Sequence, residues 1–330
     1  MRPLHLFLLV WLASTSCSSV KLKAIKYTVR AADGYPITAY ELLNGRKKDI
    51  PARPRALVFY VQGSVYETAL TKVDKLASAV IFGARAFLVE KRGCYADTIN
   101  LEEAWRFADK ETWVSDYHRV IDSITSTVAA DIPVILVGGS EGGDVAAALS
   151  ARSPRITHLI LIGSGGGMSQ KQEFRYFLDN GPPPFLQGYT RKSLDSMFAA
   201  IESSEDSMLN WQGYPYKRWK TYMNDSALAH LQKVNIPILL VHGTADAAVP
   251  VLSARSLDSA LHAQGKTNIT YKEYEGVDHS LLHQPTGKSH FPVLEVDMVQ
   301  WLNQHGVVKD IEATIFIKRI KKNHKDLFVE

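Results

Sequence analysis

A serine flanked by glycines stands where an apolar run of the chain ends. Residues 134–137 are aliphatic, and Gly138, Ser140 and Gly142 follow them in the pattern Gly-x-Ser-x-Gly. The small residues of 143–148 come next, and this order predicts a strand, a sharp turn and a helix. Glycines avoid a steric clash across such a turn. An exposed serine on it could attack a carbonyl group if a base accepted its proton, whereas a turn that only reverses the chain would need no base.

An acid and a base follow this serine along the chain. Asp246 comes shortly after the aliphatic run 238–241, and His279 lies in the loop after the run 269–274. His279 could accept the proton of Ser140 at one ring nitrogen while the other nitrogen donates to Asp246. A helix cap is the alternative role for Asp246, and an ordinary loop position is the alternative for His279. Three such groups after three predicted strands, in the order Ser, Asp, His, favour a catalytic triad.

A fourth feature could stabilise the negative oxygen that forms when a serine attacks a carbonyl. The apolar run 56–61 leads into Gln62-Gly63-Ser64. We predict that the backbone amides of Ser64 and Glu141 form an oxyanion hole, since the small Gly63 would let the backbone approach the substrate. Loss of one such donor typically slows a reaction about 10²- to 10³-fold. A plain turn at 62–64 is the alternative.

The pattern of apolar runs indicates which elements position these residues. Asp33-Gly34 separates the first two β-branched runs and predicts a hairpin. Later runs alternate with helical patterns, which favours an α/β sheet that is antiparallel at its start and parallel afterwards. Strands are expected at 25–29, 37–43, 56–61, 86–89, 134–137, 156–162, 238–241 and 269–274, and helices at 115–128, 143–150, 251–264 and 292–304.

One segment is longer than a crossover between parallel strands requires. Residues 168–230 include a proline run at 182–184 and the aromatic residues Trp211 and Trp219. Ligands of open α/β sheets bind outside the carboxyl ends of the strands, where this segment leaves and returns. We therefore expect a mostly helical lid that lines a pocket. A peripheral subdomain without a role in the reaction is the alternative.

Taken together, these motifs resemble the α/β-hydrolase superfamily, and within it the prolyl-oligopeptidase-like and dienelactone-hydrolase-like branch. The resemblance rests on Gln62-Gly63-Ser64, Glu90-Lys91-Arg92-Gly93, 138–142, His242-Gly243-Thr244-Ala245-Asp246 and Gly276-Val277-Asp278-His279. It implies a Ser-His-Asp triad that hydrolyses esters, amides or peptides without a metal or an organic cofactor. The chain departs from the family at Gln62, where a histidine is usual. It also has too few residues before Asp33 for the propeller of prolyl oligopeptidases.

The sequence thus predicts a serine hydrolase that works through an acyl-Ser140 intermediate. The absent propeller and the aromatic insertion favour carboxylic esters over amides or peptides, so the expected partner is a small-molecule acyl substrate or a short peptide. A non-catalytic ligand-binding protein on the same fold is the alternative, because a fold alone does not establish a function.

Composition excludes several other classes. The chain has 330 residues and a formal charge of +4, without a basic stripe interleaved with aromatic residues, so we expect no nucleic acid partner. The basic run 318–322 is expected to be a solvated face rather than a membrane or partner contact. Residues 163–167 are glycine-rich but lack the sequence context of a phosphate-binding loop. Two cysteines, Cys17 and Cys94, cannot form a disulfide framework or a zinc site.

The first residues have the order of a secretory signal. Arg2 precedes the apolar run 4–13, and small residues follow at 14–19. We expect a signal peptide at 1–19 and a hydrolase domain at 20–330, without a transmembrane segment in the mature chain, exported to a periplasm or secreted. A lipid anchor at Cys17 is an option, although Ser14 stands where lipoprotein signals usually have an aliphatic residue. A buried first element is the alternative to export.

Overall fold

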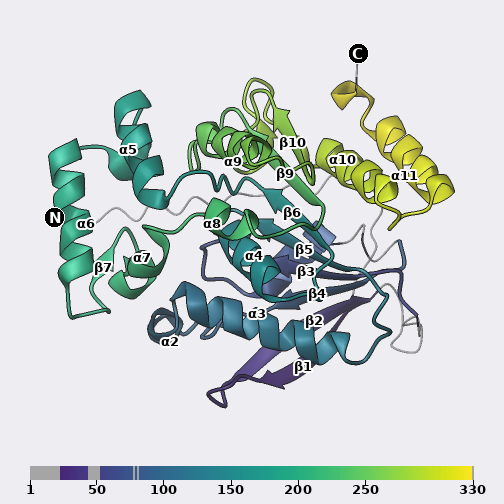
Figure 1. Cartoon of the computed structure of the whole chain (residues 1–330), viewed down its shortest axis with the longest axis horizontal. Helices are drawn as coiled ribbons and strands as arrows, with labels where there is room; N and C mark the ends of the chain where they lie inside the picture. Colours follow the sequence, from purple (N-terminus) through teal and green to yellow (C-terminus); the bar gives the residue numbers. More distant parts are fainter. Residues whose placement is uncertain (1–22, 44–52, 77–78, 80–81, 329–330) are drawn as a thin grey trace.

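An eight-stranded sheet forms the centre of the computed structural model, which describes residues 23–43, 53–76, 79 and 82–328 (Figure 1). In spatial order its strands are β1 (Lys23–Arg30), β2 (Pro36–Leu43), β4 (Arg85–Val89), β3 (Leu57–Val61), β5 (Val134–Gly139), β6 (His158–Ile162), β9 (Ile238–Gly243) and β10 (Ile269–Tyr274). β2 pairs antiparallel with both β1 and β4, and the other neighbouring pairs are parallel. The expected fold class, a mostly parallel sheet with an antiparallel start, is confirmed.

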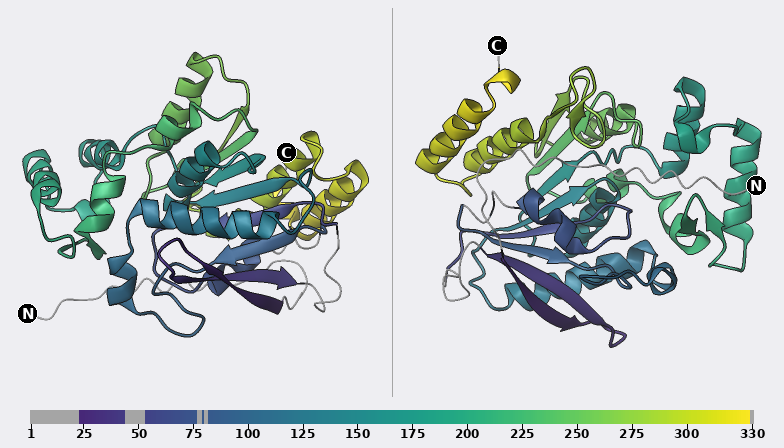
Figure 2. Two further views of the ribbon diagram at one scale, coloured as in Figure 1. Left: turned by 60° about the horizontal axis from the view of Figure 1, so that its bottom comes forward. Right: turned by 180° about the vertical axis from the view of Figure 1, so that it is seen from behind.

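Helices cover both faces of the sheet (Figure 2). One face carries α3 (Lys110–Thr125), α4 (Glu141–Arg152), α8 (Ala227–Leu231) and α9 (Val251–Ala263), and the other carries the 3-10 helix η2 (Ala69–Leu76) and α10 (Phe291–Gln304). Successive strand residues point to opposite faces, so that Phe59 packs in the first apolar cluster and Val58 in the second. Burial on both faces explains why the central strands are almost continuously apolar.

Residues between β6 and β9 form a group of helices beside the sheet, seen at the left of Figure 1. The elements are α5 (Gln170–Asn180), the 3-10 helix η3 (Pro184–Leu186), α6 (Arg191–Ser203), β7 (Asn210–Trp211), β8 (Tyr214–Pro215) and α7 (Tyr216–Tyr222), followed by α8. The group has an apolar cluster of its own, which includes Phe174, Phe198 and Trp211. Its action as a lid stays a prediction.

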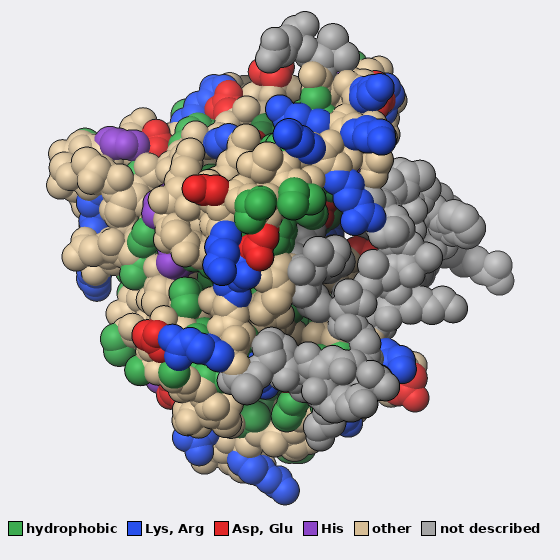
Figure 3. Space-filling view, turned by 90° about the vertical axis from the view of Figure 1, so that its right-hand side faces the viewer, with side chains coloured by type: hydrophobic (Ala, Val, Ile, Leu, Met, Phe, Trp, Pro, Cys, Tyr) green, Lys and Arg blue, Asp and Glu red, His purple; other side chains and the backbone are tan. Residues whose placement is uncertain are grey.

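The remaining elements are short or terminal: α2 (Leu101–Arg106), β11 (Leu282–His283), β12 (Lys288–Ser289), α11 (Asp310–Asn323) and the 3-10 helix η4 (Lys325–Leu327). On α11, Ala313 packs with Val299 of α10, whereas Lys318, Lys321 and Lys322 are exposed. Figure 3 shows Lys and Arg side chains scattered over the face that it presents, with Asp and Glu among them.

Two sequence predictions concern the relation of the chain to membranes. Within the described residues, no helix is long and apolar enough to cross a bilayer. The predicted signal peptide at 1–19 and Cys17, the optional anchor, lie outside the described residues.

Candidate active site

Ser140 lies between β5 and α4 on a turn that only small neighbours permit. Its φ of 53° is a left-handed value that non-glycine residues seldom adopt outside strained functional turns. A Cβ atom on Gly142 would lie 2.1 Å from the carbonyl oxygen of Val61, and one on Gly138 would lie 2.7 Å from that of Gly142. The amide of Ser140 donates to the carbonyl of Ile162 at 2.9 Å, which ties the turn to β6.

The structure brings the three predicted triad residues together at the carboxyl ends of β5, β9 and β10. The Ser140 hydroxyl lies 3.0 Å from Nε2 of His279, and Nδ1 of His279 lies 2.8 Å from Oδ2 of Asp246. Both distances are within hydrogen-bonding range. The Asp246 side chain is 1% exposed, whereas that of His279 is 31% exposed. The imidazole is therefore open to a substrate, and the carboxylate behind it is shielded from water.

Asp246 is held in place by its own loop. Its Oδ1 accepts hydrogen bonds from the amides of Ala248 and Val249 at 2.8 and 2.9 Å, which leaves Oδ2 for His279. The buried His242 approaches the same Oδ2 at 3.5 Å, and its Nε2 lies 3.0 Å from the carbonyl of Val249, to which it donates. Asp246 thus has few alternative orientations.

The surroundings of His279 favour its protonated form more than water does. Burial lowers the pKa of His279, but the hydrogen bond and charge of Asp246, with a contribution from Asp278, raise it overall above its ordinary value. An imidazolium at His279 is consequently more stable than in water.

The predicted oxyanion turn lies directly against the serine turn. A Cβ atom on Gly63 would be 3.2 Å from Cβ of Ser140, a tight contact that would push the two segments slightly apart. The side chain of Gln62 points inward and donates to the carbonyl of Val89 at 2.6 Å. Lys91, which is almost fully buried, donates to the carbonyl oxygens of Gly63 and Val65.

A cavity of about 950 Å³ extends from Ser140 and His279. Ser64 and Glu141, the two predicted oxyanion residues, also line it. Its apolar wall lies between the sheet and α10 and includes Val58, Tyr60, Ile135, Val137, Ile160 and Met298. Its polar wall lies toward α5 and α7 and includes Asp144, Glu173, Tyr214 and Arg218. A ligand with an apolar and a polar part would match these walls.

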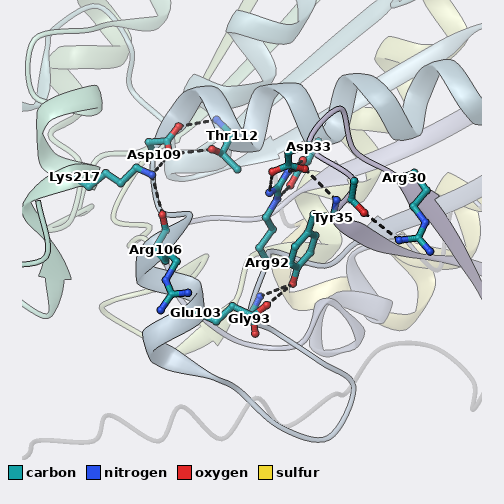
Figure 4. A network of polar contacts seen from close by, with 12 residues as sticks. Arg30, Asp33, Tyr35, Arg92, Gly93, Glu103, Arg106, Asp109, Thr112 and Lys217 are labelled. Atoms are coloured by element: carbon teal, nitrogen blue, oxygen red, sulfur yellow. Dashed lines mark hydrogen bonds and ion pairs between the residues drawn. The ribbon is translucent and has the colours of Figure 1, made fainter.

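Sequence reasoning missed three residues that support the site: His242, Lys91 and Arg218. The first two stand inside matched motifs, His242-Gly243 and Glu90-Lys91-Arg92-Gly93, so their positions carried a signal. Figure 4 shows the neighbouring Arg92, whose guanidinium pairs with Asp33 of the first hairpin. No sequence pattern pointed to Arg218, because it lies in the insertion, far from Ser140 along the chain.

Within the described part of the chain, no three His, Cys, Asp or Glu residues are grouped so that they could hold a metal ion. The Nδ1 atom of His283 lies 2.9 Å from the Thr286 hydroxyl. The ring of His290 packs 4.6 Å from that of Tyr274. Cys94 is buried and has no disulfide partner among the described residues.

Comparison with solved structures finds the same fold in several proteins. A dienelactone hydrolase from Klebsiella pneumoniae is 13% identical, with a TM-score of 0.56 over 86% of this chain and 99% of that one. A bromoperoxidase from Bacillus anthracis is 17% identical, with a TM-score of 0.53 over 84% of this chain and 100% of that one. A puromycin-hydrolyzing peptidase from Mycobacterium tuberculosis is 15% identical, with a TM-score of 0.57 over 86% of this chain, which spans 40% of that one.

Comparison with curated proteins gave no match in sequence. The model of the serine aminopeptidase family S33 matches residues 54–286, which is most of the chain. The matched segment contains the serine turn, the Asp246 loop and the His279 loop, together with the parallel strands β3, β4, β5, β6, β9 and β10. The chain therefore belongs to the serine aminopeptidase S33 family and is a serine-type hydrolase with the α/β-hydrolase fold.

Proposed function

We propose that the protein hydrolyses carboxylic esters through an acyl-Ser140 intermediate. The observation that carries the proposal is the connected pair of short distances, 3.0 Å from Ser140 Oγ to His279 Nε2 and 2.8 Å from His279 Nδ1 to Asp246 Oδ2. Both nitrogens of one imidazole are thereby engaged as a general base requires. Ser140 and His279 line the cavity, so that a bound acyl group can reach them.

The reaction follows from the positions of these groups. Ser140 Oγ forms a bond to the carbonyl carbon while its proton moves to His279 Nε2, and Asp246 stabilises the resulting imidazolium. The amides of Ser64 and Glu141 donate to the negative oxygen. The bond to the leaving alcohol then breaks, and the alcohol takes the proton from His279. Water repeats the sequence at the acyl-Ser140 carbonyl, which releases the acid and restores Ser140.

An ester is the preferred substrate because much of the cavity wall is apolar and suits an acyl group. A second candidate is an aminoacyl amide, which the family description as aminopeptidases suggests. Asp144 and Glu173 line the polar wall. Burial raises the pKa of Asp144 to about 6 and raises that of Glu173 well above its usual range. A substrate ammonium group between these carboxylates would favour their charged forms.

The lid belongs to the same proposal. Glu173 and Phe174 of α5 and Arg218 and Trp219 of α7 line the cavity that holds Ser140. These residues lie in the segment 168–230 that the sequence predicts to be a lid. We propose that this segment shapes the substrate site.

A panel of p-nitrophenyl esters and aminoacyl p-nitroanilides tests the proposal. Wild type should hydrolyse the esters faster, and Ser140→Ala should lose at least about 10³-fold in kcat. A fluorophosphonate should label wild type at Ser140 and leave the variant unlabelled. Faster anilide turnover would support the aminoacyl amide instead. Absence of labelling in folded protein that still binds a ligand would favour the non-catalytic binding protein.

A further inference from the structure

One segment of the proposed lid contacts both residues whose amides are the proposed oxyanion donors. The guanidinium of Arg218, on α7, pairs with the carboxylate of Glu141, the first residue of α4. The two side chains are 5% and 3% exposed, so water does not screen this ion pair. Glu141 directly follows Ser140, and the peptide between them carries the N–H that would face the oxyanion.

The second contact reaches the oxyanion turn. The Tyr214 hydroxyl interacts with the side chain of Ser64, and this interaction partly offsets the rise that burial causes in the pKa of Tyr214. The ring of Tyr214 also lies 6.0 Å from that of Tyr66 in the same loop. Because the guanidinium of Arg218 stacks 4.4 Å above the Tyr214 ring, the contacts to Ser64 and Glu141 belong to one packed unit.

Neighbouring contacts fix this unit relative to the sheet. Lys217 Nζ lies 2.9 Å from Asp109 Oδ2 and donates to the carbonyl of Arg106 at 2.8 Å (Figure 4). The Trp219 indole donates to the carbonyl of Trp211 at 2.9 Å, and the Arg218 guanidinium stacks 4.2 Å above the Trp219 ring. The guanidinium therefore has a fixed position from which it can hold Glu141.

We propose that Arg218 is a positioning residue that couples the lid to the oxyanion hole, an inference that rests on the proposed function. Its charge keeps the Glu141 carboxylate buried and ionised, and this holds the first turn of α4 with its amide toward the cavity. Without Arg218, Glu141 becomes an uncompensated buried charge that must take up a proton or turn toward water. Either change shifts the Glu141 peptide and loosens the Tyr214 contact to Ser64.

This coupling acts on the transition state more than on the substrate. Donors of an oxyanion hole are aimed at the oxygen of the tetrahedral intermediate, so their misplacement lowers kcat and leaves KM nearly unchanged. Since the amides would be displaced rather than removed, we expect Arg218→Met to lower kcat about 10- to 100-fold, less than the loss of a whole donor. Affinity for a tetrahedral boronic acid inhibitor should fall by a similar factor.

The experiment compares three variants with a matched lid control. Arg218→Met removes the charge, Arg218→Lys keeps it, and Glu141→Gln keeps a hydrogen-bonding partner for Arg218. The control is Arg175→Met, which removes an ion pair between α5 and α6, 2.7 Å from Arg175 Nη2 to Asp195 Oδ1. For each protein we would measure kcat, KM, boronic acid affinity and the melting temperature, with assays well below the lowest melting temperature.

The expected result is a kcat loss in Arg218→Met with partial recovery in Arg218→Lys, a smaller loss in Glu141→Gln, and wild-type kcat in Arg175→Met. Equal losses in Arg218→Met and Arg175→Met would overturn the inference, as would a raised KM with unchanged kcat, which would make Arg218 a substrate-binding residue. If Arg218→Met does not fold, Arg218→Lys and Glu141→Gln carry the comparison, and wild-type kcat in both contradicts it. Ser140→Ala distinguishes failure of this inference from failure of the proposed function. Retained turnover in that variant rejects the proposed function itself.

Discussion

The serine turn and the lid are held together by different kinds of contact. At the turn, backbone atoms meet: a Cβ atom on Gly142 would lie 2.1 Å from one carbonyl oxygen and 2.5 Å from the next. In the lid, side chains meet: the rings of Trp211 and Trp219 are 4.7 Å apart, and Phe174 packs against Phe198 and both tryptophans. Backbone contacts leave no room for substitution, whereas packed aromatic side chains can be exchanged for others of similar volume.

This difference suggests a division of roles. The sheet and its turns set the positions of Ser140, Asp246 and His279, and the proposed proton transfer requires these positions to hold within a fraction of an ångström. Residues of the proposed lid line part of the cavity, where we expect a change to alter which substrate fits. Equivalent substitutions should therefore have larger effects in the sheet and its turns than in the lid.

The largest effect is expected when the charge behind His279 is removed. Asp246→Asn keeps the size of the side chain, but its amide oxygen should stay with the amides of Ala248 and Val249, so its NH2 group faces Nδ1 of His279. Nδ1 must then accept a hydrogen bond, the proton moves to Nε2, and His279 is held in the wrong tautomer. We expect kcat to fall about 10³- to 10⁴-fold. Steady-state kinetics on the best ester gives the loss, and an unchanged circular dichroism spectrum shows that the fold is retained. A loss below tenfold would mean that Asp246 is not the residue that orients the base.

A glycine substitution in each region gives the next largest contrast. Gly142→Ala places a methyl group against the carbonyls of Val61 and Gln62, and we expect it to cost more than about 3 kcal/mol and to abolish fluorophosphonate labelling. Gly188, in the lid, has a φ of 83° and nothing within 4 Å of the added Cβ. Gly188→Ala should then cost only the left-handed backbone strain of about 1–2 kcal/mol, with kcat unchanged.

Chemical denaturation of both variants checks this contrast. Comparable losses of unfolding free energy in the two variants would show that the serine turn and the lid tolerate substitution equally. The proposed division of roles between the two regions would then be wrong. Loss of labelling in Gly188→Ala without loss of stability would instead extend the sensitive region into the lid.

The same difference between the two regions explains which features could be predicted from the sequence. The run 238–241 predicts β9 and the position of Asp246, because a buried strand appears in the sequence as an apolar run and the loop after it as polar residues. The pattern predicts that α3 starts at 115, whereas the helix begins at Lys110. Its N-cap is Asp109, whose side chain accepts from the amide of Thr112, and the apolar pattern alone does not reveal such a cap.

Contacts between segments that are distant along the chain could not be predicted from the sequence. Glu141 and Arg218 are separated by 77 residues, and only the packing of α7 brings them together. The sequence pattern does not predict the helix α11, because its solvated face carries the basic run 318–322 and its buried side has few residues, such as Ala313 and Ile320. Propensity and periodicity describe single elements, and these features arise from tertiary packing.

The smallest expected effect concerns the pH dependence of kcat/KM. It separates the contribution of the triad from that of the carboxylates that line the polar wall of the cavity. His279 must be neutral to accept a proton, so kcat/KM should rise with pH through the pKa of His279 in the free enzyme. Since Asp246 and Asp278 outweigh burial and raise this pKa, the midpoint should lie above the ordinary histidine value of 6.5. Asp144, whose pKa burial raises to about 6, lines the same cavity.

If the triad alone governs the acid limb with a neutral ester, Asp144→Asn should leave its midpoint in place. The measurement is kcat/KM from pH 5 to 9 for wild type and Asp144→Asn with one neutral ester, over a range where both proteins stay folded. Burial, Asp246 and Asp278 set the pKa of His279, so removing the charge of Asp144 should not alter proton transfer from Ser140. A midpoint that moves in this variant would show that the carboxylates near the lid influence proton transfer. The sheet with its turns and the lid would then not have separate roles at the cavity they share.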